Sequence, residues 1–488
     1  MKNKYTQKLF FWKSEHIILS LIIVLAFILR FYKIDSPLAD WHSWRQADTS
    51  AVTRIFINEK IDLFHPKYDD LSSIPSGKPN PQGYRFVEFP IFNFISAIIY
   101  QTSDRFEIEI LERLVSIFFS LISIIFIYKI TSKFLDQKTA LLASFFFAVL
   151  PFNIFYSRSI LPEPMMVTLS LISIYFFTLW LEDDLKLGSK YFLLCSLFAS
   201  LSLLIKPFVL FLSFPLIYLF FKKYQFRIYR VPQIILFIVC ACLPFFLWRW
   251  WMRQFPEGIP ASDWLFNAEN IRFKGAFFYW LFADRFGRLI LGYWGLLLLL
   301  LGLLVKPTKK EGLFFLTWFT GILAYFFVIA KGNVTHDYYQ IIAIPIISIF
   351  LAKGSILLLS PSKTLNQILL FPVFITCLLF TLAFSWYHVR GFFNINHPEI
   401  VKAGRMADRL LPPQAKVIAP YGGDTAFLYQ TKRKGWPIGG NIEEKIKEGA
   451  SFYIAVEKNQ ETDELQNKYE TVFQTDEFMI LNLKKGKK

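Results

Sequence analysis

Ten residues near the amino terminus, Asp40–Thr49, combine several groups that can do chemistry. The segment holds two carboxylates, Asp40 and Asp48, together with the imidazole of His42 and the guanidinium of Arg45. A carboxylate at hydrogen-bond distance can take a proton from an acceptor hydroxyl or amine. A guanidinium or a protonated imidazole can stabilise a phosphate that leaves with growing negative charge. The segment therefore has residues suited to group transfer from a phosphate.

Residues of the same types recur at four later points of the chain. Each point lies where the chain enters or leaves a long apolar run. Tryptophan and tyrosine at such points can hold a sugar ring together with the first isoprene units of a lipid carrier. The further candidates are Glu88, Arg158, Glu163, Lys206, His336 and Tyr338.

Membrane-crossing helices must position these residues. Apolar runs of about 15–20 residues recur from Ile17 to Tyr387, and a hydrocarbon core of ~30 Å needs a helix of that length. Inside lipid each backbone amide must be satisfied within its own segment, so the runs must be helical. The first run lacks a small-residue cleavage site and is interpreted as a retained helix. We predict about eleven crossings, at 17–34, 113–130, 139–156, 164–181, 191–205, 207–221, 232–251, 290–305, 313–330, 340–358 and 367–387.

Lysine and arginine predict the side of each loop. The amino terminus carries Lys2, Lys4, Lys8 and Lys13, which predicts a cytoplasmic start. The short run 91–102 is interpreted as interfacial, because one more crossing would put a strongly basic loop outside. That loop contains Lys222, Lys223, Arg227 and Arg230. Alternation then assigns the cytoplasmic loops as 131–138, 182–190, 222–231, 306–312 and 359–366, and puts every candidate residue on the outer side.

Composition divides the chain into two parts. Residues 1–390 are predicted to form a transmembrane catalytic domain, in which 35–110 is a long first outer loop. Within that loop, 44–58 is expected to be an amphipathic helix along the membrane surface. Residues 391–488 are charged and predict a small α/β domain of ~100 residues on the outer side. Its β-like runs are 416–419, 452–456 and 478–483, its clearest helix is 442–448, and Tyr421–Asp424 is interpreted as an ordinary strand-end turn.

Several partners are excluded by the same patterns. The net charge is +16, but the basic residues collect in short loops, as orientation in a membrane requires, so no nucleic-acid partner is expected. The four cysteines make no metal-binding spacing. No nucleotide-binding fingerprint is present, which argues against a soluble nucleotide-sugar as donor. We expect no cofactor.

The chain resembles the integral-membrane glycosyltransferases of the GT-C fold, specifically the protein O-mannosyltransferases and lipid A aminoarabinose transferases. The resemblance covers about residues 10–390. It implies a transmembrane helical GT-C fold, no nucleotide, no metal, and an essential acidic residue early in the first outer loop. The motifs that carry it are Glu88-Phe89-Pro90, Ser157-Arg158 followed by Pro162-Glu163, Lys206-Pro207 and His336-Asp337-Tyr338-Tyr339.

The chain departs from this family at one important place. The family usually shows an Asp-Glu pair near the position of Arg45-Gln46, so the base stays open between Asp40 and Asp48. Helical spacing puts Asp48 one turn from Arg45 on the same face, which favours Asp48. The resemblance places a second acidic residue at Glu163.

The sequence therefore predicts an inverting membrane glycosyltransferase with a polyprenyl-phosphate-sugar donor. Asp48 or Asp40 would deprotonate a lipid, glycan or protein acceptor, and Glu163 would position the acceptor or support the base. Arg158, Lys206 or His336 would hold the leaving phosphate. Substrate would also bind His42, Arg45, Glu88 and Tyr338. We expect a multi-pass protein of a bacterial inner membrane, with its carboxy-terminal domain in the periplasm.

Other interpretations stay open at this point. A polysaccharide polymerase or ligase would depend on outer-loop arginines, and a transporter or lipid flippase would need ionisable residues near mid-membrane. A non-catalytic scaffold is a further alternative. Each residue also has a structural role available: Asp40 as a helix cap, Asp48 in an ion pair with Arg45, Glu163 beside a helix start, and Arg158 and Lys206 as interfacial side chains.

Overall fold

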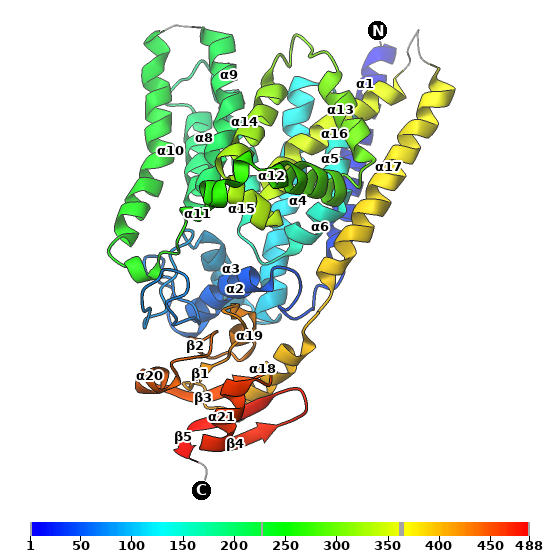
Figure 1. Cartoon of the computed structure of the whole chain (residues 1–488). Helices are drawn as coiled ribbons and strands as arrows, with labels where there is room; N and C mark the ends of the chain where they lie inside the picture. Colours follow the sequence, from blue (N-terminus) through cyan, green and yellow to red (C-terminus); the bar gives the residue numbers. More distant parts are fainter. Residues whose placement is uncertain (1, 226–227, 361–365, 487–488) are drawn as a thin grey trace.

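A computed structural model describes residues 2–225, 228–360 and 366–486 (Figure 1). A bundle of helices forms the chain up to Phe393, and a five-stranded sheet with its own helices forms the rest. The sheet lies at the end of the bundle opposite to the amino terminus (Figure 1). The predicted fold class, a helical membrane part followed by a small α/β domain, is confirmed.

The bundle contains helices long and apolar enough to cross a bilayer. Among the described residues there are six, or up to eight if each of two bent pairs forms one span. In two of them a short 3₁₀ helix leads into an α-helix. The six are α4 (Ile108–Phe134), α7 (Glu163–Glu182), η1 with α9 (Pro207–Leu212, Ser213–Tyr224), α10 (Val231–Met252), η6 with α16 (Asp337–Ala343, Ile344–Leu359) and the helix that begins with α17 (Gln367–Val389).

The crossing predicted at 139–156 is divided at Pro151. It forms α5 (Gln137–Val149) and α6 (Pro151–Arg158), which are bent by 64° relative to each other. Proline has no N–H for the helical hydrogen bond and its ring crowds the preceding turn, so a bend at this residue is expected.

The crossing predicted at 290–305 contains α13 (Gly295–Leu304), but a sharp turn precedes this helix. The helical segment Gly275–Ile290, which comprises α12 (Gly275–Phe278) and η5 (Tyr279–Ile290), ends where the crossing was expected to begin. The chain then turns by 111° into α13 (Gly295–Leu304). Both Gly292 and Tyr293 have positive φ, a conformation that a right-handed helix cannot continue through.

Three other predicted crossings form helices that are not among these eight. Two are shorter than a full span, and the third is the amino-terminal helix, of which Lys2, Lys4, Lys8 and Lys13 have side chains outside the described set. The predicted number of eleven therefore stays a prediction. The three are α8 (Lys190–Ile205), α14 (Phe314–Val328) and α1 (Lys2–Arg30).

The helix expected along the membrane surface is instead buried. It forms α2 (Ser43–Asn58), in which 12 of 16 residues are buried. The helix packs against α3 (Ile91–Thr102), which is the short apolar run of the first outer loop, and against α19 (Thr425–Gln430) of the carboxy-terminal domain. The prediction that 44–58 lies on a surface was wrong, because α19, which buries one side of this helix, comes from a distant part of the chain.

Two of the basic loops meet at one end of the bundle. The Lys222 ammonium donates to the carbonyls of Lys309 and Lys310 at 3.3 and 3.0 Å. The amino terminus lies at the same end, and α2 lies at the other (Figure 1). Arg227 and most of the loop 359–366 lie outside the described residues. The loops are thus distributed as the lysine and arginine pattern predicts, while their sides of the membrane stay a prediction.

The carboxy-terminal domain is built on a mixed sheet of order β2-β1-β3-β5-β4. Strands β2, β1 and β3 are parallel, and β5 runs antiparallel to both β3 and β4. Each predicted β-like run contributes to a strand. The elements are α18 (Pro398–Leu410), β1 (Lys416–Ile418), α19, β2 (Gly435–Trp436), α20 (Ile442–Lys447), β3 (Ala450–Ala455), α21 (Gln460–Lys468), β4 (Tyr469–Gln474) and β5 (Met479–Gly486).

Short helices complete the chain between the longer ones. Most of them lie in the segment 252–289 or next to the last bundle helices. They are η2 (Ile228–Arg230), η3 (Pro256–Gly258), α11 (Trp264–Asn267), η4 (Ala268–Phe273), α15 (Ala330–Thr335) and η7 (Arg390–Phe393).

Close packing of α13 on α16 predicts a strong effect of one methyl group. A Cβ at Gly354 would overlap the carbonyl oxygen of Leu298, and small residues are what allow membrane helices to approach this closely. Gly354→Ala is expected to cost about 1–3 kcal/mol of stability, measured as thermal unfolding in detergent. Gly391→Ala, where a Cβ meets no atom within 4 Å, is the control. Equal unfolding temperatures for the two variants would contradict the packing.

Candidate active site

A cavity of about 440 Å³ lies where the first outer loop, the bundle and the carboxy-terminal domain meet. Its walls come from α2 and the loop after it, from the beginning of η1, and from the end of α10 and the segment after it. The start of η6 with the residue before it, and the start of α19 with the turn before it, complete the walls. Its charged and hydroxyl-bearing lining includes Arg45, Asp48, Tyr68, Asp70, Arg85, Lys206, Arg249, Ser262, His336, Tyr338, Tyr339, Asp424 and Thr425.

The structure separates the predicted site residues into two groups. Half of them line this cavity, namely Arg45, Asp48, Lys206, His336 and Tyr338. The others do not line it. These are Asp40, His42, Glu88, Arg158 and Glu163.

Asp48 presents its carboxylate to the cavity. One oxygen, Oδ2, lies 2.9 Å from Nη2 of Arg85, and the other, Oδ1, accepts a hydrogen bond of 2.6 Å from the Thr425 hydroxyl. Burial raises the pKa of Asp48, and Arg85 and Thr425 only partly offset this effect. The ion-pair partner is Arg85, whereas the sequence suggested Arg45. Asp48 is thus a buried carboxylate with an elevated proton affinity in the cavity wall.

A chain of opposite charges supports the cavity from the bundle side. The Arg45 guanidinium donates to both oxygens of Glu88 at 2.9 and 2.8 Å. The Lys206 ammonium lies 4.0 Å from Glu88 and 3.4 Å from Glu163. All four side chains are less than a tenth exposed. Two positive and two negative charges therefore balance in a place with little water.

Glu163 is the least satisfied member of this chain. Within the described residues neither of its carboxylate oxygens has a hydrogen-bond partner, so its contact with Lys206 is an ion pair without hydrogen-bond geometry. Burial lowers the pKa of Lys206, and Glu163 opposes that effect. Glu163 therefore favours the charged form of Lys206. Its own side chain does not line the cavity.

Asp40 belongs to a separate buried contact. Its Oδ2 lies 3.3 Å from Nη2 of Arg158, and its Oδ1 accepts a hydrogen bond of 2.7 Å from Gln46. Arg158 also donates to the carbonyl of Lys33 at 2.6 Å. Asp40 does not cap α2, because His42 occupies the cap position. These contacts join the first outer loop to α6 away from the cavity, which favours Asp48 over Asp40 as the candidate base.

His42 pairs with Asp337 beside the cavity. The His42 Nε2 lies 2.6 Å from Oδ1 of Asp337, which also accepts from the Tyr156 hydroxyl. The other oxygen of Asp337 accepts from the indole of Trp41 at 3.0 Å. His42 adopts a left-handed backbone conformation with φ 55°, an uncommon one for a residue other than glycine. Asp337 thus fixes the start of α2 against α6 and η6.

Aromatic rings form one wall of the cavity around His336. The ring stacks on Tyr338 at a centroid distance of 5.4 Å and lies 5.5 Å from Trp44 and 5.7 Å from Trp264. Burial is the main cause that lowers the pKa of His336 to about 3, and the nearby imidazole of His42 adds to this effect. His336 is therefore neutral at neutral pH, and it suits a sugar face better than the phosphate role expected from the sequence.

Several cavity residues were missed by the sequence reasoning. Arg249, near the end of α10, lines the cavity, and in the described parts of the chain it has no carboxylate partner. Arg85 was visible in the first outer loop but was not selected. Asp424 and Thr425 come from the carboxy-terminal domain, and only the fold brings them to Asp48. Among the described residues no group of three His, Cys, Asp or Glu side chains is placed to hold a metal ion.

The fold and part of the sequence are similar to known proteins. A family model described as dolichyl-phosphate-mannose-protein mannosyltransferase matches residues 88–251. The crystal structure of ArnT from Cupriavidus metallidurans bound to undecaprenyl phosphate superposes with a TM-score of 0.65, at 10% identity, over 95% of this chain and 97% of that chain. The chain has the GT-C fold.

Other comparisons agree on this fold. The apo state of the same ArnT has a TM-score of 0.61 at 10% identity, with 95% and 97% of the two chains covered. The oligosaccharyltransferase of Archaeoglobus fulgidus has a TM-score of 0.55 at 9% identity, over 91% of this chain and 69% of that chain. No curated protein sequence is significantly similar to the chain. The predicted resemblance is confirmed: the chain has the GT-C fold, and the mannosyltransferase family model matches residues 88–251 within it.

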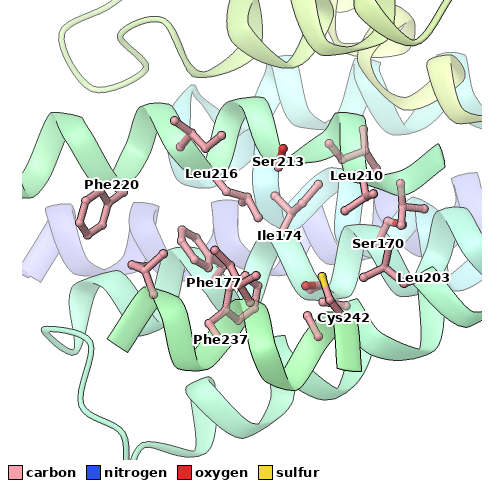
Figure 2. Close-up of a pocket in the computed structure, with 18 of the residues that line it drawn as sticks. Ser170, Ile174, Phe177, Leu203, Leu210, Ser213, Leu216, Phe220, Phe237 and Cys242 are labelled. Carbon is pink, nitrogen blue, oxygen red and sulfur yellow. The ribbon is translucent and has the colours of Figure 1, made fainter. Parts of the chain in front are cut away.

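This GT-C chain has a second, apolar cavity of about 520 Å³. It lies between α7, α8, α9 and α10, and Figure 2 shows side chains such as Ile174, Leu216 and Phe237 directed into it. The beginning of η1 connects the two cavities: Lys206–Phe208 line the polar one, and Val209, Leu210 and Leu212 line the apolar one. A polar and an apolar cavity thus adjoin along one short helix.

The Asp40–Arg158 contact predicts a stability effect. Arg158→Gln removes the charged partner of a fully buried carboxylate, and breaking such a pair costs about 3–5 kcal/mol. The unfolding temperature in detergent should fall markedly. Lys402→Gln, which breaks the exposed pair with Glu477, should change stability by less than about 0.5 kcal/mol. Wild-type stability of Arg158→Gln would contradict the structural role.

Proposed function

We propose that the protein transfers a sugar from a polyprenyl-phosphate donor to an acceptor on the outer face of a bacterial inner membrane. The observation that carries this proposal is the junction of the two cavities at η1. A lipid-linked sugar has one apolar end and one polar end with a phosphate between them. The junction offers an apolar space, cationic side chains and an aromatic-walled polar space in that order.

The apolar cavity suits the prenyl tail of such a donor. Its lining is almost entirely hydrocarbon and aromatic, with a few small hydroxyl and thiol groups. α10 contributes Phe237 and Cys242 to this lining and Arg249 to the polar cavity. A tail between α7 and α10 would therefore bring its phosphate toward Arg249 and Lys206. The undecaprenyl phosphate bound to ArnT, a protein of the same fold, supports a polyprenyl carrier.

Arg249 is the best placed cation for the leaving phosphate. The guanidinium of Arg45 is held by Glu88, and that of Arg85 by Asp48. The guanidinium of Arg249 contacts the sulfur of Met252 and the Phe245 ring, so a phosphate would not compete with a carboxylate for it. An arginine can donate two parallel hydrogen bonds to a phosphate.

Asp48 is the proposed base. It would take the proton of an acceptor hydroxyl or amine while the acceptor atom attacks the anomeric carbon of the sugar. The bond from that carbon to the phosphate oxygen breaks at the same time, and its electron pair leaves with the phosphate. Arg249 and Lys206 stabilise the charge that develops there. One displacement from the opposite face inverts the configuration, and the wall around His336 would hold the sugar ring.

Replacing the proposed base should abolish transfer. Removing a general base typically lowers a rate by about 10²–10⁴, so Asp48→Asn should have this effect on transfer from a radiolabelled polyprenyl-phosphate-sugar pool. Because burial raises the pKa of Asp48, wild-type activity should fall with decreasing pH above the range of an ordinary carboxyl group. Asp62→Asn, an exposed aspartate of the same loop, is the control. Full activity of Asp48→Asn at matched expression would contradict the assignment.

Arg249→Gln should weaken the donor interaction. Losing charged hydrogen bonds to the phosphate is expected to raise the dissociation constant for polyprenyl phosphate about tenfold or more. The measurement is binding of polyprenyl phosphate alone to purified protein. Arg253→Gln, on the next turn and outside the cavity lining, should bind as the wild type does. Equal affinity of both variants would place the phosphate elsewhere.

A further inference from the structure

The carboxy-terminal domain contributes a hydroxyl group to the polar cavity. The chain leaves β1 through Gly422 and Gly423, which have φ of 60° and 85°, a region that glycine adopts readily. Asp424 then caps α19 by accepting from the amide of Ala426 at 2.7 Å. Thr425, the first residue of α19, directs its hydroxyl to Oδ1 of Asp48 at 2.6 Å. The turn expected from the sequence therefore places the Thr425 side chain against Asp48, the candidate base.

Contacts along α19 fix this hydroxyl in place. The Tyr429 hydroxyl lies 2.8 Å from that of Ser50 and donates to Glu109 at 2.6 Å. The Arg54 guanidinium lies 4.2 Å from the Tyr429 ring centroid. Ser50 and Arg54 belong to α2 and Glu109 belongs to α4, so α19 is held on α2 near both of its ends.

A strand contact fixes the domain at a second point. Gly435 of β2 donates its amide to the carbonyl of Asp69 at 2.9 Å and accepts from the amide of Leu71 at 2.8 Å. Asp69 and Leu71 belong to the first outer loop, which also contains Arg85. Both partners of Asp48 are therefore held in a fixed relation to each other.

We propose that Thr425 is a positioning residue for Asp48 and that the carboxy-terminal domain thereby completes the catalytic centre. The inference rests on the proposed function, in which Asp48 is the base. Arg85 holds one carboxylate oxygen and Thr425 holds the other, so the plane of the carboxylate is determined. An oxygen of an ionised carboxylate can accept more than one hydrogen bond. Oδ1 can therefore accept from Thr425 and from the acceptor together.

The Thr425 hydroxyl also acts on the charge of Asp48. A hydrogen bond donated to a carboxylate favours its ionised form. Arg45 and Arg85 favour the same form, while Glu88 and the other nearby carboxylates oppose it. The groups that face Asp48 are Arg45 of α2, Tyr68, Asp69, Asp70, Arg85 and Glu88 of the first outer loop, and Asp424 beside Thr425. Loss of the Thr425 hydroxyl should raise the proton affinity of Asp48 further.

The test is the pH dependence of sugar transfer by the full-length protein with Thr425→Val. Valine keeps the shape of threonine without the hydroxyl. The acidic limb of the activity profile should move to higher pH by about one pH unit, because one charged hydrogen bond is lost. Activity on that limb should fall about tenfold and recover at alkaline pH. Thr425→Ser, which keeps a hydroxyl, should restore the wild-type profile.

Two controls make the result decisive. Thr471→Val removes a threonine hydroxyl from β4, at the edge of the sheet opposite to β2, and leaves the contacts of α19 intact, so it should not move the acidic limb. Thr425→Ala is the second hydroxyl-free variant in case valine impairs folding, as judged by size exclusion. A uniform loss at every pH, or an unchanged profile of a folded hydroxyl-free variant, would overturn the proposal.

Asp48→Asn separates this inference from the function on which it rests. If Asp48→Asn retains transfer, the base assignment falls and the role of Thr425 falls with it. If Asp48→Asn abolishes transfer while Thr425→Val keeps the wild-type pH profile, only the role of Thr425 is refuted.

Discussion

Burial of charge in balanced groups is the constraint on which the rest of the structure depends. Arg45, Glu88, Lys206 and Glu163 lie almost out of contact with water, and an isolated charge in such a place would cost many kcal/mol. Each of them therefore needs the others. They come from α2, the loop before α3, the start of α7 and the residue before η1. These four segments can bury their charges only if they meet, and their meeting forms the floor of the polar cavity.

The same constraint distinguishes structural charges from candidate catalytic groups in and around the cavity. Charges that balance one another hold the cavity open and in shape. Asp48 is different, because its partners come from the loop before α3 and from the carboxy-terminal domain and its burial raises its pKa. Arg249 is different again, because it faces the cavity without a carboxylate partner among the described residues. A carboxylate with elevated proton affinity and a guanidinium without a carboxylate partner, both lining the polar cavity, suit the proposed transfer from a lipid phosphate.

Sequence patterns predicted the helical membrane part well because that prediction depends on local properties. Run length and hydropathy identify a membrane helix without knowledge of its neighbours. The bends were less accessible: Pro151 gave a signal that was not used, and the turn at Gly292 and Tyr293 depends on packing. The strands of the carboxy-terminal domain were recognised from their β-branched and aromatic runs, although β2 is too short to leave a pattern.

The candidate site was predictable only in part, since residue type does not say what a side chain will face. Asp40 and Asp48 are the same residue in the same loop, yet one holds Arg158 inside the bundle and the other lines the cavity. α2 was expected on a surface because its cover, α19, is far away in the sequence. Thr425 is 377 residues from Asp48, and no spacing rule connects them. Such contacts become visible only in the fold.

A structure of the protein with bound polyprenyl phosphate, determined by electron cryo-microscopy, tests the central claim most directly. The account predicts that the phosphate lies beside Arg249 and Lys206 and that the prenyl chain runs between α7 and α10 into the apolar cavity. The anomeric side of the phosphate would then face Asp48. A lipid bound on another face of the bundle, with the apolar cavity filled by protein side chains or left without the chain, would contradict the account.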